Sequence, residues 1–264
     1  MNLSANSKIA LGALLVVALA TSVVLIGTID LGVPEDSVRV TLLTNAGVMI
    51  EAEGLTIYID PIELPASYGS KPADAILITH DHGDHYESSV VEMLQKEDTV
   101  NVFPAIMTTA IETHDGIGVN PEDVIQVGVA DITAFYMYTF AEGGLEATHP
   151  RESNFTSYIV EINEFTVFHA GDSKTLDEYS GLTGTIDVAM LPLGPGCQTM
   201  ADDEVFAAIQ RIEPEYFIPI HFGEGAVDTF CSSFGTQIEE TVGCEVVTLT
   251  SYASRTFQMG TGIT

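Results

Sequence analysis

Three imidazoles and two carboxylates fall within six residues of the sequence, His80-Asp81-His82-Gly83-Asp84-His85. So many polar groups are costly to bury unless each is paired. Imidazole and carboxylate together form a ligand set that suits zinc, iron or manganese. The apolar, β-branched run at residues 75–78 is typical of a buried strand, and the Asp and Gly residues that follow favour a loop. The pattern predicts metal ligands at the end of a strand.

The spacing within this segment predicts two ions. His80 and His82 alternate across the end of the strand, so both can face one ion. Asp84 and His85 follow the turn at Gly83 and can reach a second ion. Two ions about 3.5–4 Å apart form a known hydrolytic device. The alternatives are a solvated His-rich loop and a single structural metal.

The pattern His80-x-His82-x-Asp84-His85 after an apolar strand resembles the signature of the metallo-β-lactamase fold superfamily. Later segments resemble its branch of small metal-dependent hydrolases, the ascorbate-6-phosphate lactonase-like proteins. The resemblance covers roughly residues 38–223. It implies an α+β fold, a four-layer αββα sandwich, and the order of predicted elements agrees with that architecture. We expect strands at 38–43, 48–51, 55–59, 75–78, 99–103, 124–127, 132–140, 158–161, 165–168, 186–192, 216–220 and 245–250, and helices at 87–95, 108–112, 200–212 and 234–241.

The resemblance supplies three further ligands. His149 stands before a Pro, Asp172 lies in a Gly-Asp-Ser motif, and His221 ends an Ile-Pro-Ile-His segment. It implies two divalent metal ions, zinc first and manganese or iron as alternatives. The expected ligands of one ion are His80, His82 and His149; those of the other are Asp84, His85 and His221; Asp172 bridges the two.

Four more residues carry expectations. Asp60 ends the strand at 55–59 and is expected to support the ligand loop by hydrogen bonding, the alternative being a plain turn. His169 is expected to face the substrate or to support a ligand, without binding metal. Asn45 stands near the position of a His in the family pattern. His114 lies in a turn-like context and is expected at the surface.

The expected activity is hydrolysis of an ester, lactone or phosphodiester by a hydroxide that two metals activate, with Asp84 relaying the proton. The substrate is a small molecule or a lipid. Cleavage of β-lactams is disfavoured, because Asp172 occupies the place of the Cys ligand of common zinc β-lactamases. One alternative is a membrane-associated, phospholipase D-like phosphodiesterase, and another is a non-catalytic metal-binding surface protein.

An apolar stretch precedes the predicted hydrolase domain. After a tail at residues 1–8, residues 9–27 would span about 28 Å as a helix, close to the thickness of a bilayer core. We expect a single-pass membrane anchor, a linker at 28–37 and the hydrolase domain at 38–264, outside the cytoplasm. The sequence Ala18-Leu19-Ala20 leaves a cleaved signal peptide as the alternative.

The composition is strongly acidic, with 38 Asp and Glu residues, 8 Lys and Arg residues and a formal net charge of −30. Such self-repulsion is screened in molar salt, which predicts a saline host. The absence of a Lys and Arg cluster argues against a nucleic-acid partner. Of the three cysteines, Cys231 and Cys244 form a disulfide or all three stay free; both arrangements remain open.

Overall fold

A computed structural model describes residues 32–260 of the chain. The predicted tail at 1–8, the predicted membrane anchor at 9–27 and the start of the linker lie outside the described residues. Within residues 32–260 no helix combines the length and apolar character needed to cross a membrane. Residues 33–260 form one compact unit.

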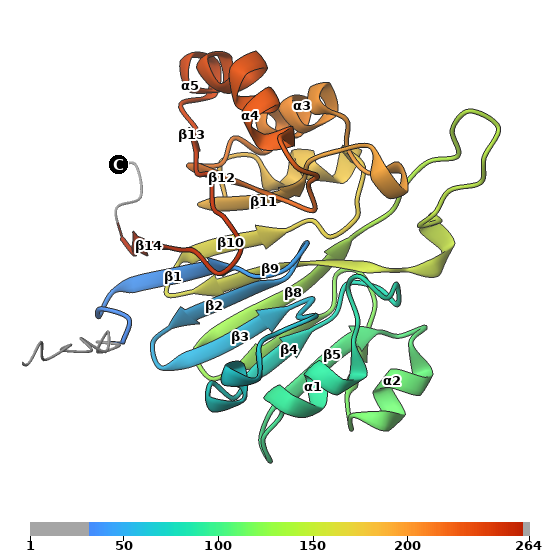
Figure 1. The fold of residues 1–264 in the computed structure, drawn as a ribbon, viewed down its shortest axis with the longest axis vertical. Helices are drawn as coiled ribbons and strands as arrows, with labels where there is room; N and C mark the ends of the chain where they lie inside the picture. Colours follow the sequence, from blue (N-terminus) through green and yellow to red (C-terminus); the bar gives the residue numbers. More distant parts are fainter. Residues whose placement is uncertain (1–31, 261–264) are drawn as a thin grey trace, which may run out of the picture. The chain divides into compact units, whose positions relative to one another are not determined.

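Fourteen strands in the described part of the chain form two mixed sheets of seven strands each (Figure 1). The first sheet has the order β14-β1-β2-β3-β4-β5-β6 and contains β1 (Ser37–Leu42), β2 (Val48–Ala52), β3 (Leu55–Ile59), β4 (Ala75–Leu77), β5 (Val100–Pro104), β6 (Ile117–Val119) and β14 (Ser254–Gln258). The second has the order β13-β12-β11-β10-β9-β8-β7 and contains β7 (Val124–Val127), β8 (Ala130–Tyr136), β9 (Thr156–Ile162), β10 (Phe165–His169), β11 (Val188–Pro192), β12 (Tyr216–Ile220) and β13 (Glu245–Val246).

Helices cover the outer face of each sheet (Figure 1). On the first sheet these are α1 (Ser88–Leu94) and α2 (Thr108–Thr113), and on the second they are α3 (Asp202–Ile212), α4 (Ala226–Phe230) and α5 (Thr236–Val242). A π-helical turn at Cys231–Gly235 joins the last two.

Three hydrophobic clusters separate these four layers. The central cluster joins the inner faces of the two sheets, and each outer cluster joins one sheet to its helices. Successive residues of one strand belong to different clusters: in β3, Ile57 and Ile59 face the central core while Tyr58 faces α1. Side chains alternate across a strand, so a strand with apolar residues at every position is buried on both faces. The expected αββα sandwich is confirmed.

The topology brings several strand ends to one edge. Strands β3, β4 and β5 run parallel, as do β10, β11 and β12. The carboxyl ends of parallel strands lie at a common edge, so the loops that follow them meet there. The two sheets are tied at this edge, because Tyr158 Oη of β9 donates to the Ile78 carbonyl at 2.8 Å and the His221 amide donates to the Asn45 carbonyl at 3.2 Å.

Candidate metal centre

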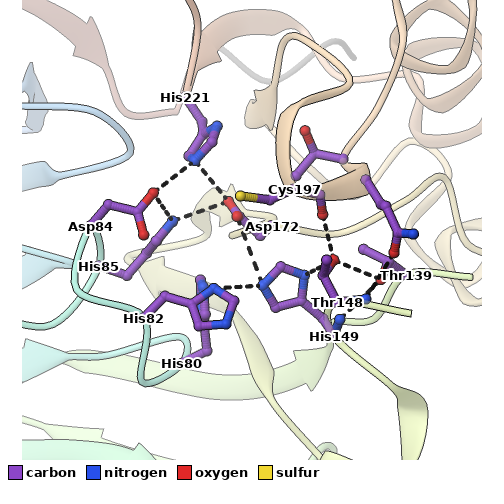
Figure 2. A network of polar contacts seen from close by, with 12 residues as sticks. His80, His82, Asp84, His85, Thr139, Thr148, His149, Asp172, Cys197 and His221 are labelled. Atoms are coloured by element: carbon purple, nitrogen blue, oxygen red, sulfur yellow. Dashed lines mark hydrogen bonds and ion pairs between the residues drawn. The ribbon is translucent and has the colours of Figure 1, made fainter. Parts of the chain in front are cut away.

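All seven residues that the sequence singled out as ligands lie in one cluster at this edge (Figure 2). Three overlapping groups have ligand atoms that all lie within 4.8 Å of one another. They are His80, His82 and His149; Asp84, His85 and His221; and a third group, His80, His85 and Asp172. The geometry therefore assembles both predicted sets, with Asp172 beside both, although binding of an ion at each set stays a prediction.

The first set consists of three imidazoles that face a common point. The ring centroid of His80 lies 4.6 Å from that of His82 and 4.6 Å from that of His149. Nε2 of His149 lies 3.2 Å from Nδ1 of His82. His80 and His149 are fully buried, so their nitrogens have no water to bind. Three converging imidazole nitrogens are a familiar ligand set for zinc.

The second set combines two imidazoles with a carboxylate. Oδ2 of Asp84 lies 3.3 Å from Nε2 of His221 and 3.9 Å from Nε2 of His85. The two rings stack at a centroid distance of 5.4 Å. The Asp84 side chain is 46% exposed, whereas His85 is fully buried. Asp84 is therefore the acidic side chain of the cluster that is open to solvent.

Asp172 divides its two oxygens between the sets. Oδ1 lies 3.1 Å from Nε2 of His85 and 3.6 Å from Nε2 of His221. Oδ2 points the other way and lies 3.9 Å from Nε2 of His149. Asp172 itself is fully buried. A carboxylate in this position can contact both metal sets at once.

Buried polar atoms without a hydrogen bond show that the cluster fits a cation. Nε2 of His80 and Oδ2 of Asp172 have no hydrogen-bond partner, and Nε2 of His85 and Oδ1 of Asp172 have only the contact of 3.1 Å with each other. A buried polar group left unpaired costs about 1–3 kcal/mol. Once Nε2 of His85 gives up its proton, all of these atoms are electron-pair donors at the centre of the cluster, so divalent metal ions would satisfy them together.

Thr79 sets the tautomer of His80. Its hydroxyl donates to Oδ2 of Asp60 at 2.6 Å, so it has no proton left for Nδ1 of His80, which lies 3.0 Å away. We therefore assign the proton to Nδ1 of His80, which donates to the Thr79 oxygen. The lone pair is left on Nε2, the atom that faces the cluster.

The same arrangement recurs at His149. The Thr148 hydroxyl donates to the carbonyl of Cys197, and Nδ1 of His149 lies 3.1 Å from that hydroxyl oxygen. The proton again belongs on Nδ1, and Nε2 faces the metal set. Neither threonine was predicted from the sequence, although the repeated dipeptide Thr-His was the available signal.

Asp60 holds the ligand loop, as predicted. It is fully buried and accepts hydrogen bonds from the Thr79 amide at 2.8 Å and from Nδ1 of His85 at 2.7 Å. A carboxylate behind a histidine fixes the ring orientation and raises the basicity of the opposite nitrogen. Asn45 has a similar role for Asp84, whose carbonyl accepts from Nδ2 of Asn45 at 3.1 Å.

The protonation of the imidazoles follows their surroundings. Burial lowers the pKa of His149 to about 4 and that of His80 well below its usual range. Burial also lowers the pKa of His85, but Asp60 and Asp172 outweigh it and raise the value to about 10. Without metal, His85 is therefore protonated near pH 7, whereas His149 is neutral.

Gly171 allows Asp172 to reach the cluster. Its φ of 56° lies in the left-handed region, and a Cβ atom there would lie 2.6 Å from Sδ of Met137 and 3.1 Å from Cβ of Thr79. Only glycine fits both the backbone angle and the space. The glycine before Asp172 is thus required by packing.

Two histidines outside the cluster are core residues. His169 is fully buried, and its Nε2 donates to the Ala46 carbonyl at 2.7 Å, so it supports the turn that carries Asn45. The expectation of a surface position for His114 is wrong: the residue is 2% exposed. Its Nε2 lies 3.0 Å from Oη of Tyr86, and its ring stacks on Phe103. The turn after α2 folds back onto the sheet and buries it.

The three cysteines are free thiols in this structure. Cys197 is exposed and Cys244 is buried. The disulfide between Cys231 and Cys244 that the sequence left open is not formed.

Comparisons with known proteins agree with this fold. The family model for the β-lactamase superfamily domain matches residues 39–221. A UPF0173 metal-dependent hydrolase of Pyrococcus furiosus is 30% identical over 201 residues, which are 70% of this chain and 84% of that protein. A UPF0173 metal-dependent hydrolase of Bacillus thuringiensis is 28% identical over 199 residues, covering 70% of this chain and 85% of the relative.

A solved structure shares the fold. A metallo hydrolase from the archaeon Ignicoccus hospitalis superposes with a TM-score of 0.68 at 20% identity, over 84% of this chain and 99% of the other. The relatives' names state metal-dependent hydrolysis without a substrate, so the resemblance to the lactonase-like branch stays a prediction. The chain belongs to the β-lactamase superfamily, as a metal-dependent hydrolase.

Proposed function

We propose that the protein hydrolyses an ester, lactone or phosphodiester at a pair of divalent metal ions, with zinc the first candidate. The observation that carries this proposal is the placement of Asp172. One of its oxygens faces His85 and His221, and the other faces His149. A buried carboxylate shared in this way is suited to contact two adjacent ions at once.

The residues have distinct tasks in this proposal. Two bound divalent ions lower the pKa of water and stabilise the charge that develops on a carbonyl or phosphoryl oxygen. The neutral Nε2 atoms of His80 and His149 serve as ligands, because threonines hold the protons on the far side of both rings. Asp60 keeps His85 oriented by accepting from its Nδ1.

Asp84 is suited to hold and pass on a proton. Its carboxylate is the exposed acid of the cluster, and Asn45 and His221 fix its orientation. A general acid or base must lie within hydrogen-bond reach of the reacting group and of solvent. The other carboxylate, Asp172, is buried and cannot exchange protons with water directly.

Metal content measured on the purified full chain tests the proposal. Elemental analysis should find about two zinc, manganese or iron ions per chain, together with turnover of p-nitrophenyl esters, lactones or bis-p-nitrophenyl phosphate. One ion per active chain would contradict the two-ion site. No bound metal and no turnover after metal is restored would instead favour a non-catalytic protein.

Two variants sharpen the measurement. Asp172→Ala should lose metal and hydrolysis together, because it removes the shared carboxylate. Asp81→Asn is the matched control: Asp81 lies in the same loop, is exposed and belongs to none of the three candidate metal groups. It should keep both properties. Full activity in Asp172→Ala would overturn the proposed role of Asp172.

A further inference from the structure

A cavity of about 430 Å³ lies directly beside the metal cluster, with His221 in its wall. Two loops form most of it, one after β11 and one after β12. The walls are largely apolar, and they include Leu193, Pro195, Gly196, Phe222, Gly223 and Ala226. The volume lies toward the lower end of the range for small-molecule sites, about 300–1,000 Å³. The cavity therefore suits a compact group attached to the atom that reacts.

Two polar side chains line this cavity, those of Asn45 and His221, and both are engaged. Asn45 donates to Asp84, and Nε2 of His221 faces the carboxylates of Asp84 and Asp172. Neither side chain carries a fixed charge that could pair with a charged group of the substrate. The remaining surface of the cavity is mostly apolar.

The cations nearest in sequence to the ligands are also committed elsewhere. Lys174 is 4% exposed and pairs with Glu204 at 2.8 Å. Arg151 pairs with Glu178 at 2.7 Å. No Lys or Arg lines the cavity. Proteins often bind phosphate groups with Arg or Lys. The cavity has neither, so bound metal ions would be the cations beside a phosphate group.

We infer that the cavity binds the apolar group of an uncharged carboxylic ester or lactone, and that this group selects the substrate. The inference rests on the proposed metal-dependent hydrolysis. Of the ester, lactone and phosphodiester substrates proposed above, it keeps the uncharged ester and lactone and excludes the charged phosphodiester. Burying an apolar group in such a cavity is favourable in proportion to its area. A terminal charge on the same group would have to be desolvated without a partner.

A series of p-nitrophenyl esters tests the inference on the unmodified protein. From acetate to butanoate to hexanoate, kcat/KM should rise about fourfold per methylene until the cavity is full, the ratio that corresponds to about 0.8 kcal/mol per buried methylene. The adipate monoester matches hexanoate in length but ends in a carboxylate, and it should react more slowly than hexanoate. A flat series, or a preference for the charged ester, would overturn the inference.

Glycines in the cavity wall allow it to be filled without backbone strain. A Cβ atom at Gly196 or Gly223 would meet nothing within 4 Å, and neither residue has a left-handed φ. Gly196→Leu and Gly223→Leu should each lower the ratio of kcat/KM for hexanoate to that for acetate. Gly181 has the same freedom but lies between Asp177 and Leu182, away from the cavity, so Gly181→Leu should leave the ratio unchanged. Unchanged ratios in both cavity variants, with native circular dichroism, would contradict the assignment.

Binding to metal-free protein separates this inference from the proposed reaction. Ethyl hexanoate cannot be turned over without metal, so calorimetry should report its binding, tighter than that of ethyl acetate and with a negative heat-capacity change. Such binding, without turnover of any ester by the metal-loaded protein, would contradict the proposed hydrolysis but support the cavity as a binding site for apolar groups. Turnover without any effect of chain length in either assay would contradict the role of the cavity but support the proposed hydrolysis.

Discussion

Nδ1 of His80 lies 3.0 Å from the hydroxyl oxygen of Thr79, whose own proton is given to Asp60. This contact leaves the lone pair of Nε2 facing the metal cluster before any metal arrives. Thr148 does the same for His149, with the Cys197 carbonyl as acceptor. Two ligands of one predicted ion are thus oriented by the residue that precedes each of them.

Removing these hydroxyl groups should weaken metal binding without unfolding the protein. Valine has nearly the shape of threonine but cannot accept from Nδ1. Thr79→Val and Thr148→Val should each lower the affinity for zinc by about 10–100-fold, the usual effect of losing a residue that orients a ligand. Competition with a chromophoric chelator measures this affinity.

The chain contains its own control for this experiment. Thr113 also precedes a histidine, but its hydroxyl donates to the Thr109 carbonyl in α2, and His114 lies outside the cluster. Thr113→Val should bind zinc as the unmodified protein does. Equal zinc affinity in all three variants would show that the hydroxyl groups do not orient the ligands.

Gly171→Ala should destabilise the protein and displace Asp172. The new methyl group combines a left-handed φ of 56° with a contact of 2.6 Å to Sδ of Met137. Gly184 is the matched control, since it has a φ of 67° but open space around its Cβ position. Gly184→Ala should cost only about 1–2 kcal/mol for the left-handed backbone, and Gly171→Ala should cost clearly more. Urea unfolding measures both, and equal losses would mean that Met137 moves aside easily.

The sequence predicted which residues lie together because their spacing reflects the topology. The candidates after β4, β10 and β12 lie at strand ends that meet at one edge, whereas His149 lies in the loop between β8 and β9. The strand at residues 55–59 and the helix at 108–112 were predicted within a residue of β3 and α2. The strand has a strong local pattern of alternating apolar residues.

What the sequence could not reveal depends on tertiary contacts. Strand β14 is exposed at four of its five positions, and only Phe257 is buried, so its sequence has little apolar pattern. The strand forms because it pairs with β1, more than 200 residues away in the chain. The strand expected at 245–250 ends after Val246, where the chain leaves the second sheet to reach the first. His114 looked like a surface residue because burial by Phe103 and Tyr86 leaves no local signal.

Metal-free protein should lose stability as the pH falls from about 6.5 to 4. Burial lowers the pKa of His149 from 6.5 to about 4, so between these values the unfolded chain binds a proton that the folded chain does not. Such a group destabilises the fold progressively as the pH drops. This shift in the pKa of His149 lowers the free energy of unfolding by about 3 kcal/mol at pH 4.

Urea unfolding of chelator-treated protein at pH 7 and at pH 4.5 measures this loss. His149→Gln removes the titrating group, so the difference in stability between the two pH values should be smaller in the variant. Carboxylates and histidines away from His149 titrate equally in both proteins and cancel from the comparison. An identical pH dependence in the two proteins would show that His149 accepts its proton freely in the folded state.

Salt should stabilise the protein. The chain has 38 acidic residues against 8 Lys and Arg, and each Lys or Arg within residues 32–260 already lies within 4 Å of a carboxylate. Acidic side chains therefore greatly outnumber the cations that could pair with them. Raising KCl from 0.1 M to 1 M shortens the Debye length from about 10 Å to about 3 Å and screens that repulsion. Tm should increase over this range in KCl, a salt chosen to avoid the exclusion effects of sulfate. A Tm that falls or stays constant would mean that the acidic surface is tolerated without screening, and the saline host inferred from the composition would lose its support.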